Sequence, residues 1–172
     1  MRALTTTSRF THSSARLTFV KCLTAWWTPK SKAELQAAIT ECLKLSSDCA
    51  KSPHGLIGLW EVSAVTNMKS LFDAQQLPAA SSFNNDISKW DVSSVTDMAG
   101  MFWIASSFKS DISKWHVSRV ATMEKLFAYA QKFNSDVSKW DVSSVTNMNS
   151  MFWNSGSVNG DISQWDVSSV TD

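Results

Sequence analysis

Residues 86–110 read DISKWDVSSVTDMAGMFWIASSFKS, and close copies follow at intervals of 25 residues. The next copies occupy residues 111–135 and 136–160, a partial fifth copy occupies residues 161–172, and a longer first copy occupies residues 56–85. One tryptophan marks the same position in each copy: Trp60, Trp90, Trp115, Trp140 and Trp165. A fixed period of 20–50 residues is the signature of stacked repeats, so the unit and not the single element is the basis of the fold.

The first half of each unit has the alternation that is typical of a β-strand. In the second unit Ile87, Trp90 and Val92 are apolar, while Lys89 and Asp91 are polar. This spacing matches the leucine-rich-repeat frame L-x-x-L-x-L. It predicts short parallel strands at residues 60–62, 90–92, 115–117, 140–142 and 165–167.

The second half of each unit has the spacing of a helix. Val95, Met98 and Phe102 fall on one helical face. Thr96 stands where a helix N-cap is expected, and the third unit has Ala121 at that position, which weakens its predicted helix start by ~1 kcal/mol.

Together the two halves predict an α/β fold. We expect a short-repeat, leucine-rich-repeat-like solenoid, with parallel strands on one face and short helices on the other. Each buried tryptophan removes ~150–250 Å² from water, so the aromatic and apolar stripes are explained as core. No cofactor is needed to account for them.

The chain divides into three parts. Residues 1–28 are basic, rich in Ser and Thr, and free of acidic residues, which resembles an organelle transit peptide. A secretory signal and an unstructured or wrongly assigned leader remain alternatives, of which we favour the last. Residues 29–55 are a cap helix and connector, and residues 56–172 are four full repeats and a truncated fifth. The abrupt C-terminal end suggests a fragment of a larger protein.

A helix is predicted from Ser31 to Leu45. Ser31 and Glu34 have the spacing of a capping box, and one face of the segment is apolar. A stack of repeats exposes apolar ends, so this helix is placed to cap the first one. The first unit also carries five extra residues, which we assign to the segment between Asp73 and Ser82, where an insertion is tolerated.

Cys42 and Cys49 flank the end of this helix. In an oxidising compartment they are candidates for a disulfide, which leaves Cys22 over. A metal site formed by Cys42, Cys49 and His54 is a weaker alternative, because the spacing is not C-x2-C and a fourth ligand is missing. Free thiols are expected if the protein stays in a reducing compartment.

The repeat phrase W-D-V-S-x-V-T-x-M-x-x-M-F resembles the short leucine-rich-repeat-like units of BspA-like surface proteins. These units occur in bacterial surface lipoproteins, including mycoplasmal ones, and in some protists and algae. The resemblance covers residues 56–172. It implies a secreted or cell-surface binding scaffold, and it offers no catalytic residues to carry over.

Catalytic signatures are absent from the sequence. It contains no G-x-S-x-G, H-E-x-x-H or P-loop motif, and its three histidines are scattered. We therefore expect no enzyme activity, cofactor or metal. The net charge of +1 gives no electrostatic case for nucleic acid, and no run approaches the ~18 apolar residues of a transmembrane helix. Four recurring acids are interpreted as turn-forming residues: Asp86, Asp111, Asp136 and Asp161.

The strand alternation also predicts which side chains face outward. On the concave sheet face, where repeat proteins usually bind, it places seven residues: Lys89, Asp91, Lys114, His116, Lys139, Asp141 and Asp166. The sequence thus favours a non-enzymatic scaffold for a protein or glycan ligand at a cell surface. The alternative is a structural spacer with no ligand of its own.

Overall fold

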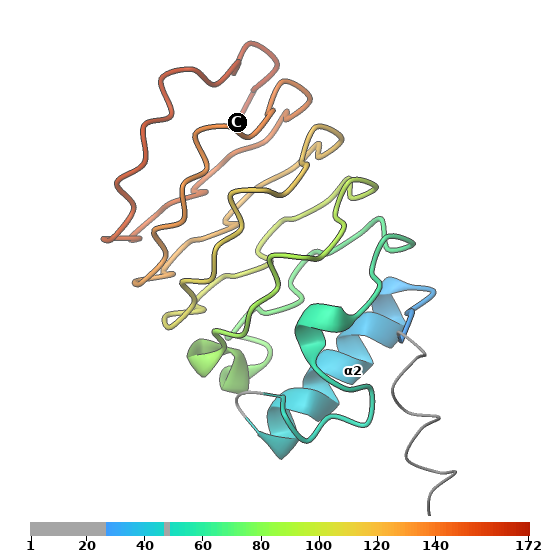
Figure 1. Ribbon diagram of the computed structural model, residues 1–172. Helices are drawn as coiled ribbons and strands as arrows, with labels where there is room; N and C mark the ends of the chain where they lie inside the picture. Colours follow the sequence, from blue (N-terminus) through green and yellow to red (C-terminus); the bar gives the residue numbers. More distant parts are fainter. Residues whose placement is uncertain (1–26, 47–48) are drawn as a thin grey trace, which may run out of the picture.

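The computed structural model describes residues 27–46 and 49–172. The repeat units lie one above another as irregular coils, with the N-terminal helix at one end of the stack (Figure 1). In the described residues the helices are α2 (Lys32–Leu45) and two short 3-10 helices, η1 (Ile57–Leu59) and η2 (Pro78–Ser82).

The predicted α/β solenoid is wrong. No strand forms at residues 60–62, 90–92, 115–117, 140–142 or 165–167, and the second halves of the units form no helices. The described part of the chain contains no sheet, so the leucine-rich-repeat architecture does not apply. Adjacent units are joined by isolated parallel bridges: Asn67 to Asp97, Asp97 to Thr122, and Thr122 to Asn147.

Turns, not a strand, produce the alternation in the first half of the unit. The amide of Trp90 donates to the carbonyl of Ile87 at 3.1 Å, and the amide of Val95 donates to that of Val92 at 2.9 Å. Each of these bonds closes a turn of four residues. The apolar side chains at the ends of these turns are buried, so their spacing mimics a strand.

Left-handed residues exclude a helix from the second half. Gly100 and Ile104 both have φ near 60°, which a right-handed helix does not accommodate. Equivalent positions in other units are also left-handed: Ser70, Lys125, Tyr129, Ser150 and Asn154. This segment instead bonds to the next unit, where the amides of Met98, Gly100, Phe102 and Ile104 donate to carbonyls at 2.7–3.1 Å.

The threonine predicted as a helix cap joins two units. The amide and hydroxyl of Thr96 both donate to the carbonyl of Thr66, at 2.8 and 3.2 Å. Ala121 keeps the amide bond, to the carbonyl of Thr96 at 2.8 Å, and has no hydroxyl to add a second. No helix begins at Ala121, so the predicted weakening of a helix start there does not apply.

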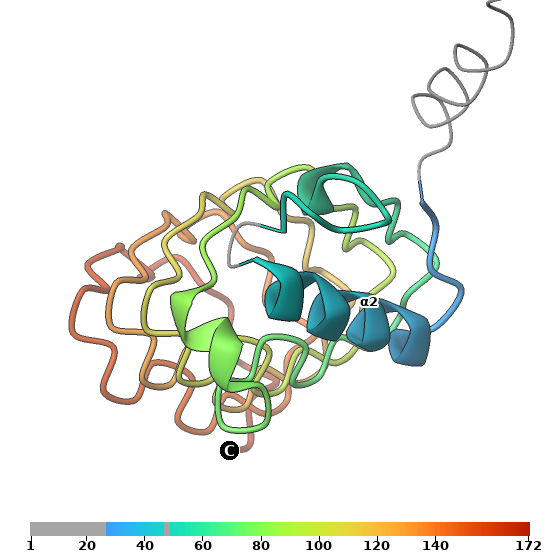
Figure 2. The ribbon, with the colours of Figure 1, turned by 90° about the horizontal axis from the view of Figure 1, so that it is seen from below.

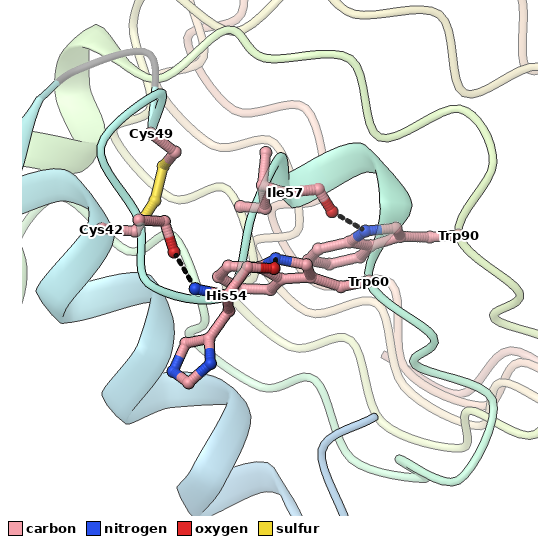
Figure 3. The surroundings of a disulfide bond; sticks show 7 residues. Cys42, Cys49, His54, Ile57, Trp60 and Trp90 are labelled. Carbon is pink, nitrogen blue, oxygen red and sulfur yellow. Dashed lines mark hydrogen bonds between the residues drawn. A yellow bond between two sulfur atoms is a disulfide. The ribbon is translucent and has the colours of Figure 1, made fainter. Parts of the chain in front are cut away.

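The repeated tryptophans lie in the core and bond to the unit before or, for Trp60, to the connector. Trp60, Trp90, Trp115 and Trp140 are at most 4% exposed. The indole N–H of each donates to a backbone carbonyl, and so does that of the half-buried Trp165. The acceptors are, in order, His54, Ile57, Ile87, Ile112 and Val137, at 2.9–3.3 Å. Figure 3 shows the bond from Trp90 to Ile57.

Phenylalanines form two stacked columns beside these tryptophans. In one column ring centroids lie 5.5–5.7 Å apart: Phe72, Phe102, Phe127 and Phe152. In the other they lie 6.0–6.1 Å apart: Phe83, Phe108 and Phe133. Val158 takes the next position and ends the second column.

Helix α2 covers one end of the stack, as Figure 2 shows, and the predicted helix is confirmed. The amide of Glu34 donates to Ser31 Oγ at 3.2 Å, and Glu34 Oε2 accepts from the amide of Lys30 at 2.7 Å. The buried face consists of Leu35, Ala38, Ile39, Cys42 and Leu43. The five extra residues lie between Phe72 and Phe83, in a segment that forms a turn and η2, and η2 is beside α2 (Figures 1 and 2).

The partial fifth unit is much more exposed than the others. Ile162 is 41% exposed and Val167 51%, whereas Ile112 and Val117 at the same positions are 0% and 1% exposed. Burial of the repeated side chains therefore depends on cover from both sides, by another unit or by the cap.

Replacing Trp115 by Ala should destabilise the protein more than replacing Trp165 by Ala. Trp115 has a unit on both sides, so its loss should cost ~3–5 kcal/mol, while terminal units of a repeat array fray first. The measurement is the urea midpoint of unfolding. Trp115→Phe is the control that keeps an aromatic ring but removes the indole N–H, and it should cost less than Trp115→Ala because the Ile87 carbonyl keeps its bond from the amide of Trp90. Equal losses at the two tryptophans would contradict this.

Candidate functional site

The seven predicted site residues are all exposed, and we call them the polar row. They are Lys89, Asp91, Lys114, His116, Lys139, Asp141 and Asp166. The prediction that they lie on the concave face of a sheet is wrong, because no sheet is present in the described residues. The lysines lie in the turns, each just before a core tryptophan, and an acid or His116 follows that tryptophan.

Carboxylates of the polar row are held by local hydrogen bonds. Oδ1 of Asp91 accepts from the amide of Ser93 at 3.0 Å, Oδ1 of Asp141 from Ser143 at 3.2 Å, and Oδ1 of Asp166 from Ser168 at 3.0 Å. These bonds lower the pKa of all three carboxyls, with the serine hydroxyl and amide as the main causes. Each acid therefore stays ionised and keeps a fixed position.

Neighbouring members of the row influence each other through their charges. His116 further lowers the pKa of Asp91, whereas the charge of Asp166 raises that of Asp141 against the effect of its serine. Among the described residues, no lysine of the row lies within ion-pair distance of an acid. In residues 27–46 and 49–172 the one ion pair joins Lys125 Nζ to Glu124 Oε1 at 3.1 Å.

A second line of acids has the turn-forming role that was predicted for it. Asp86, Asp111, Asp136 and Asp161 each accept, through Oδ1, from the serine amide two residues on, at 2.9–3.0 Å. The serines lower the pKa of these carboxyls as well.

Two equivalent hollows open between units on this side of the molecule. One, of about 430 Å³, lies between the second and third units and is lined by Asn84, Asp86, Ser88, Lys89, Ser110, Asp111 and Lys114. The other, of about 380 Å³, lies two units further and is lined by Asn134, Ser135, Asp136, Ser138, Asn159, Gly160 and Asp161. The first hollow brings together Lys89 and Lys114 of the polar row; the other members of the row line neither hollow.

The sequence prediction of the site missed a group of exposed and half-buried aromatic residues on the bridged side of the stack. Trp153 is 58% exposed, and its ring lies 5.3 Å from that of Tyr129. Trp103, half-buried, lines a third pocket. A break in the period could have revealed this group, because the repeat position of Trp103 holds, in successive units, Asp73, Trp103, Ala128 and Trp153.

The cysteines near the cap form a disulfide and not a metal site. Cys42 and Cys49 are joined, with Cα atoms 4.8 Å apart, and both are fully buried (Figure 3). Among the residues that the structure describes, no group of three or more His, Cys, Asp or Glu side chains could hold a metal ion. Cys22 and most of the predicted leader, residues 1–26, lie outside the described residues.

The acids at the turn corners should make stability depend on pH in the acid range. Their folded pKa values lie below the ordinary value of about 3.9, so their contribution is present above that pH and is lost as the pH falls toward the folded values. We expect the urea midpoint to fall less on acidification in the combined variant Asp86→Asn, Asp111→Asn, Asp136→Asn than in the parent.

Asparagine keeps the acceptor and removes the charge. The chain already uses it in this way, since the amides of Lys69 and Asn149 donate to Asn67 Oδ1 and Asn147 Oδ1. An unchanged dependence of the midpoint on pH in the variant would show that these carboxyls do not couple to folding.

Comparison with known proteins identifies a family. No curated protein and no solved structure shows significant similarity to the chain. In the described part of the chain, none of the helices has the length and apolar character needed to cross a membrane. A family model matches residues 40–77 and again residues 75–172, which together cover most of the sequence. The chain therefore belongs to the family described as "Mycoplasma protein of unknown function, DUF285".

Proposed function

We propose that this chain is a non-enzymatic repeat scaffold that binds a protein or glycan ligand at a cell surface. The observation that carries the proposal is the recurrence of one polar hollow at equivalent positions, two units apart. Asn84, Asp86 and Ser88 of the first hollow correspond to Asn134, Asp136 and Ser138 of the second. A ligand with its own regular repeat could occupy both hollows at once, which raises affinity without new kinds of contact.

The chemistry of the hollows suits a ligand rich in hydroxyl or amide groups. Carboxylates and amide oxygens accept hydrogen bonds, while serine hydroxyls and the ammonium groups of Lys89 and Lys114 donate them. Because both kinds of group are present, the surface selects by the pattern of donors and acceptors and not by charge alone.

The hollows are also fixed in position. The amide of Lys109 donates to Asn84 Oδ1 at 2.8 Å, and the amide of Asn159 donates to Asn134 Oδ1 at 3.1 Å. Both bonds cross from one unit to the next. Side chains held in this way lose little freedom when a ligand binds, which favours affinity.

Support for a surface location comes from the resemblance to BspA-like surface proteins. The family match fits the mycoplasmal side of that resemblance and gives no function. Secretion and surface display are therefore part of the proposal, and so is formation of the buried disulfide in an oxidising compartment.

The test is binding to arrays of defined surface glycans and peptides, followed by calorimetry with a ligand so found. The combined variant Lys89→Ala, Lys114→Ala should lower affinity by about ten-fold or more. Affinity should also fall with salt, since exposed charges are screened over ~10 Å at 0.1 M. The matched control is Lys44→Ala, Lys132→Ala, two exposed lysines outside the polar row.

A second variant, Asp91→Ala, His116→Ala, Asp141→Ala, tests whether the row beyond the hollow takes part. Unchanged affinity in both variants would show that the ligand binds another face of the protein. Absence of any ligand on the arrays would favour the alternative, a spacer with no ligand of its own.

A further inference from the structure

A third pocket lies on the opposite, bridged side of the stack, where three units meet. It has a volume of about 210 Å³. Its lining includes Lys69 and Gln76 from the first unit, Gly100 and Trp103 from the second, and Glu124 and Lys125 from the third. It shares no residue with the polar row or its hollows.

The insertion in the first unit contributes to the pocket through Gln76. Gln76 belongs to the extra residues between Phe72 and Phe83, which the other units lack. Insertions in repeat proteins often form the binding face. Gln76 Nε2 donates to Oδ2 of the buried Asp73 at 2.8 Å, which fixes the amide and leaves its Oε1 as an acceptor.

Trp103 is the apolar wall of the pocket, and its backbone is fixed on both sides. The amide of Trp103 donates to the carbonyl of Gly100 at 3.1 Å, and its carbonyl accepts from the amide of Ala74 at 2.8 Å. The side chain is only half-buried, unlike the core tryptophans. An indole in this setting offers a flat apolar surface with little conformational freedom to lose.

Lys125 lies over this surface and is held there weakly. Its Nζ is 5.3 Å from the ring centroid of Trp103, and it pairs with Glu124 at 3.1 Å. Exposed cation–π contacts and exposed ion pairs are both weak. A ligand can therefore displace the flexible lysine from the ring and still receive a hydrogen bond from its ammonium group.

The pocket lining carries side chains of both signs. Lys69 and Lys125 are basic, Glu124 is acidic, and Gln76 adds an uncharged amide. Donors and acceptors are therefore both present. A hydroxylated ring with an apolar C–H face matches this arrangement, since each hydroxyl both donates and accepts and the ring carries no charge.

We propose that this pocket binds one ring of an uncharged pyranoside, stacked on Trp103. The pocket is smaller than the ~300–1,000 Å³ typical of drug-sized ligands, so it takes a single ring and not a chain. Gln76 and Glu124 accept from ring hydroxyls, and Lys69 and Lys125 donate to them. The site does not rest on the function proposed for the polar row.

The chain contains its own matched control. Trp153 stands at the same position two units further and has the same backbone bonds, to Ser150 and Tyr129 at 3.0 and 2.8 Å. It is more exposed than Trp103, and it has no equivalent of Gln76. If an exposed indole alone were enough, Trp153 would bind as well as Trp103.

The experiment follows indole N–H signals in ¹H–¹⁵N correlation spectra of the full chain, with Trp103→Phe used to assign Trp103. The probes are methyl β-D-glucopyranoside, methyl β-D-galactopyranoside and methyl α-D-mannopyranoside, with glucuronate and glucosamine as charged comparisons. At least one neutral probe should cause a saturable shift of the Trp103 signal. Trp103→Ala and Gln76→Ala should each weaken its binding by about ten-fold or more, and Trp153→Ala should leave it unchanged. Binding by Trp103→Ala is read from the backbone amide signals of Gly100 and Lys125, because its indole signal is lost.

Three outcomes would overturn the proposal. They are no saturable shift with any neutral probe at tens of millimolar, an equal response of Trp153, and tighter binding of a charged probe. If Trp103→Ala fails to fold, the proposal is tested with Gln76→Ala and Glu124→Gln. Both residues are at the surface, so their replacement should not prevent folding. The variant Lys89→Ala, Lys114→Ala should leave the shift intact, so this site and the polar row can fail separately.

Discussion

The architecture depends on the hydrogen bond from each repeat tryptophan to a carbonyl of the unit before it. A buried indole N–H without a partner costs ~1–3 kcal/mol, so the bond sets where one unit sits on the next. Once this register is fixed, the phenylalanine columns align and the bridged segments meet. The polar row, its hollows and the Trp103 pocket are all positioned by the same register.

The period of 25 residues, the buried side chains and the cap helix could be predicted from the sequence. The backbone within the unit could not, because apolar spacing reports which side chains are buried and not how the chain turns between them. The segment expected to be a strand contains two turns, while the segment expected to be a helix carries the bridges and left-handed residues such as Ile104. One signal was available: D-x-S occurs twice in most units, at Asp86 and Asp91 for example, and aspartate two residues before a serine amide is a turn former.

The candidate site was predictable only in part. Residues of the polar row are exposed, as the alternation implied, although turns and not a strand place them there. The hollows could not be predicted, because side chains from two stacked units form them. They also depend on where the residue type changes between units, as at the equivalent positions Asn84, Lys109 and Asn134. Predicting the Trp103 pocket would have required the path of the chain through the five-residue insertion, and a periodic pattern does not contain this information.

The direction of the bonds between units also bears on how the chain folds during synthesis. The tryptophan bond and the threonine bond both run from a later unit to a carbonyl of an earlier one. A ribosome adds about 5–20 residues per second, so one unit of 25 residues emerges in about 1–5 s. Each new unit thus meets these acceptors, and the donor amides of the bridged segment, already in place on the earlier unit, beginning with the first unit on its disulfide-linked cap. Contacts span about one unit of sequence, which keeps the loop-closure cost of each step small and constant however many units are added.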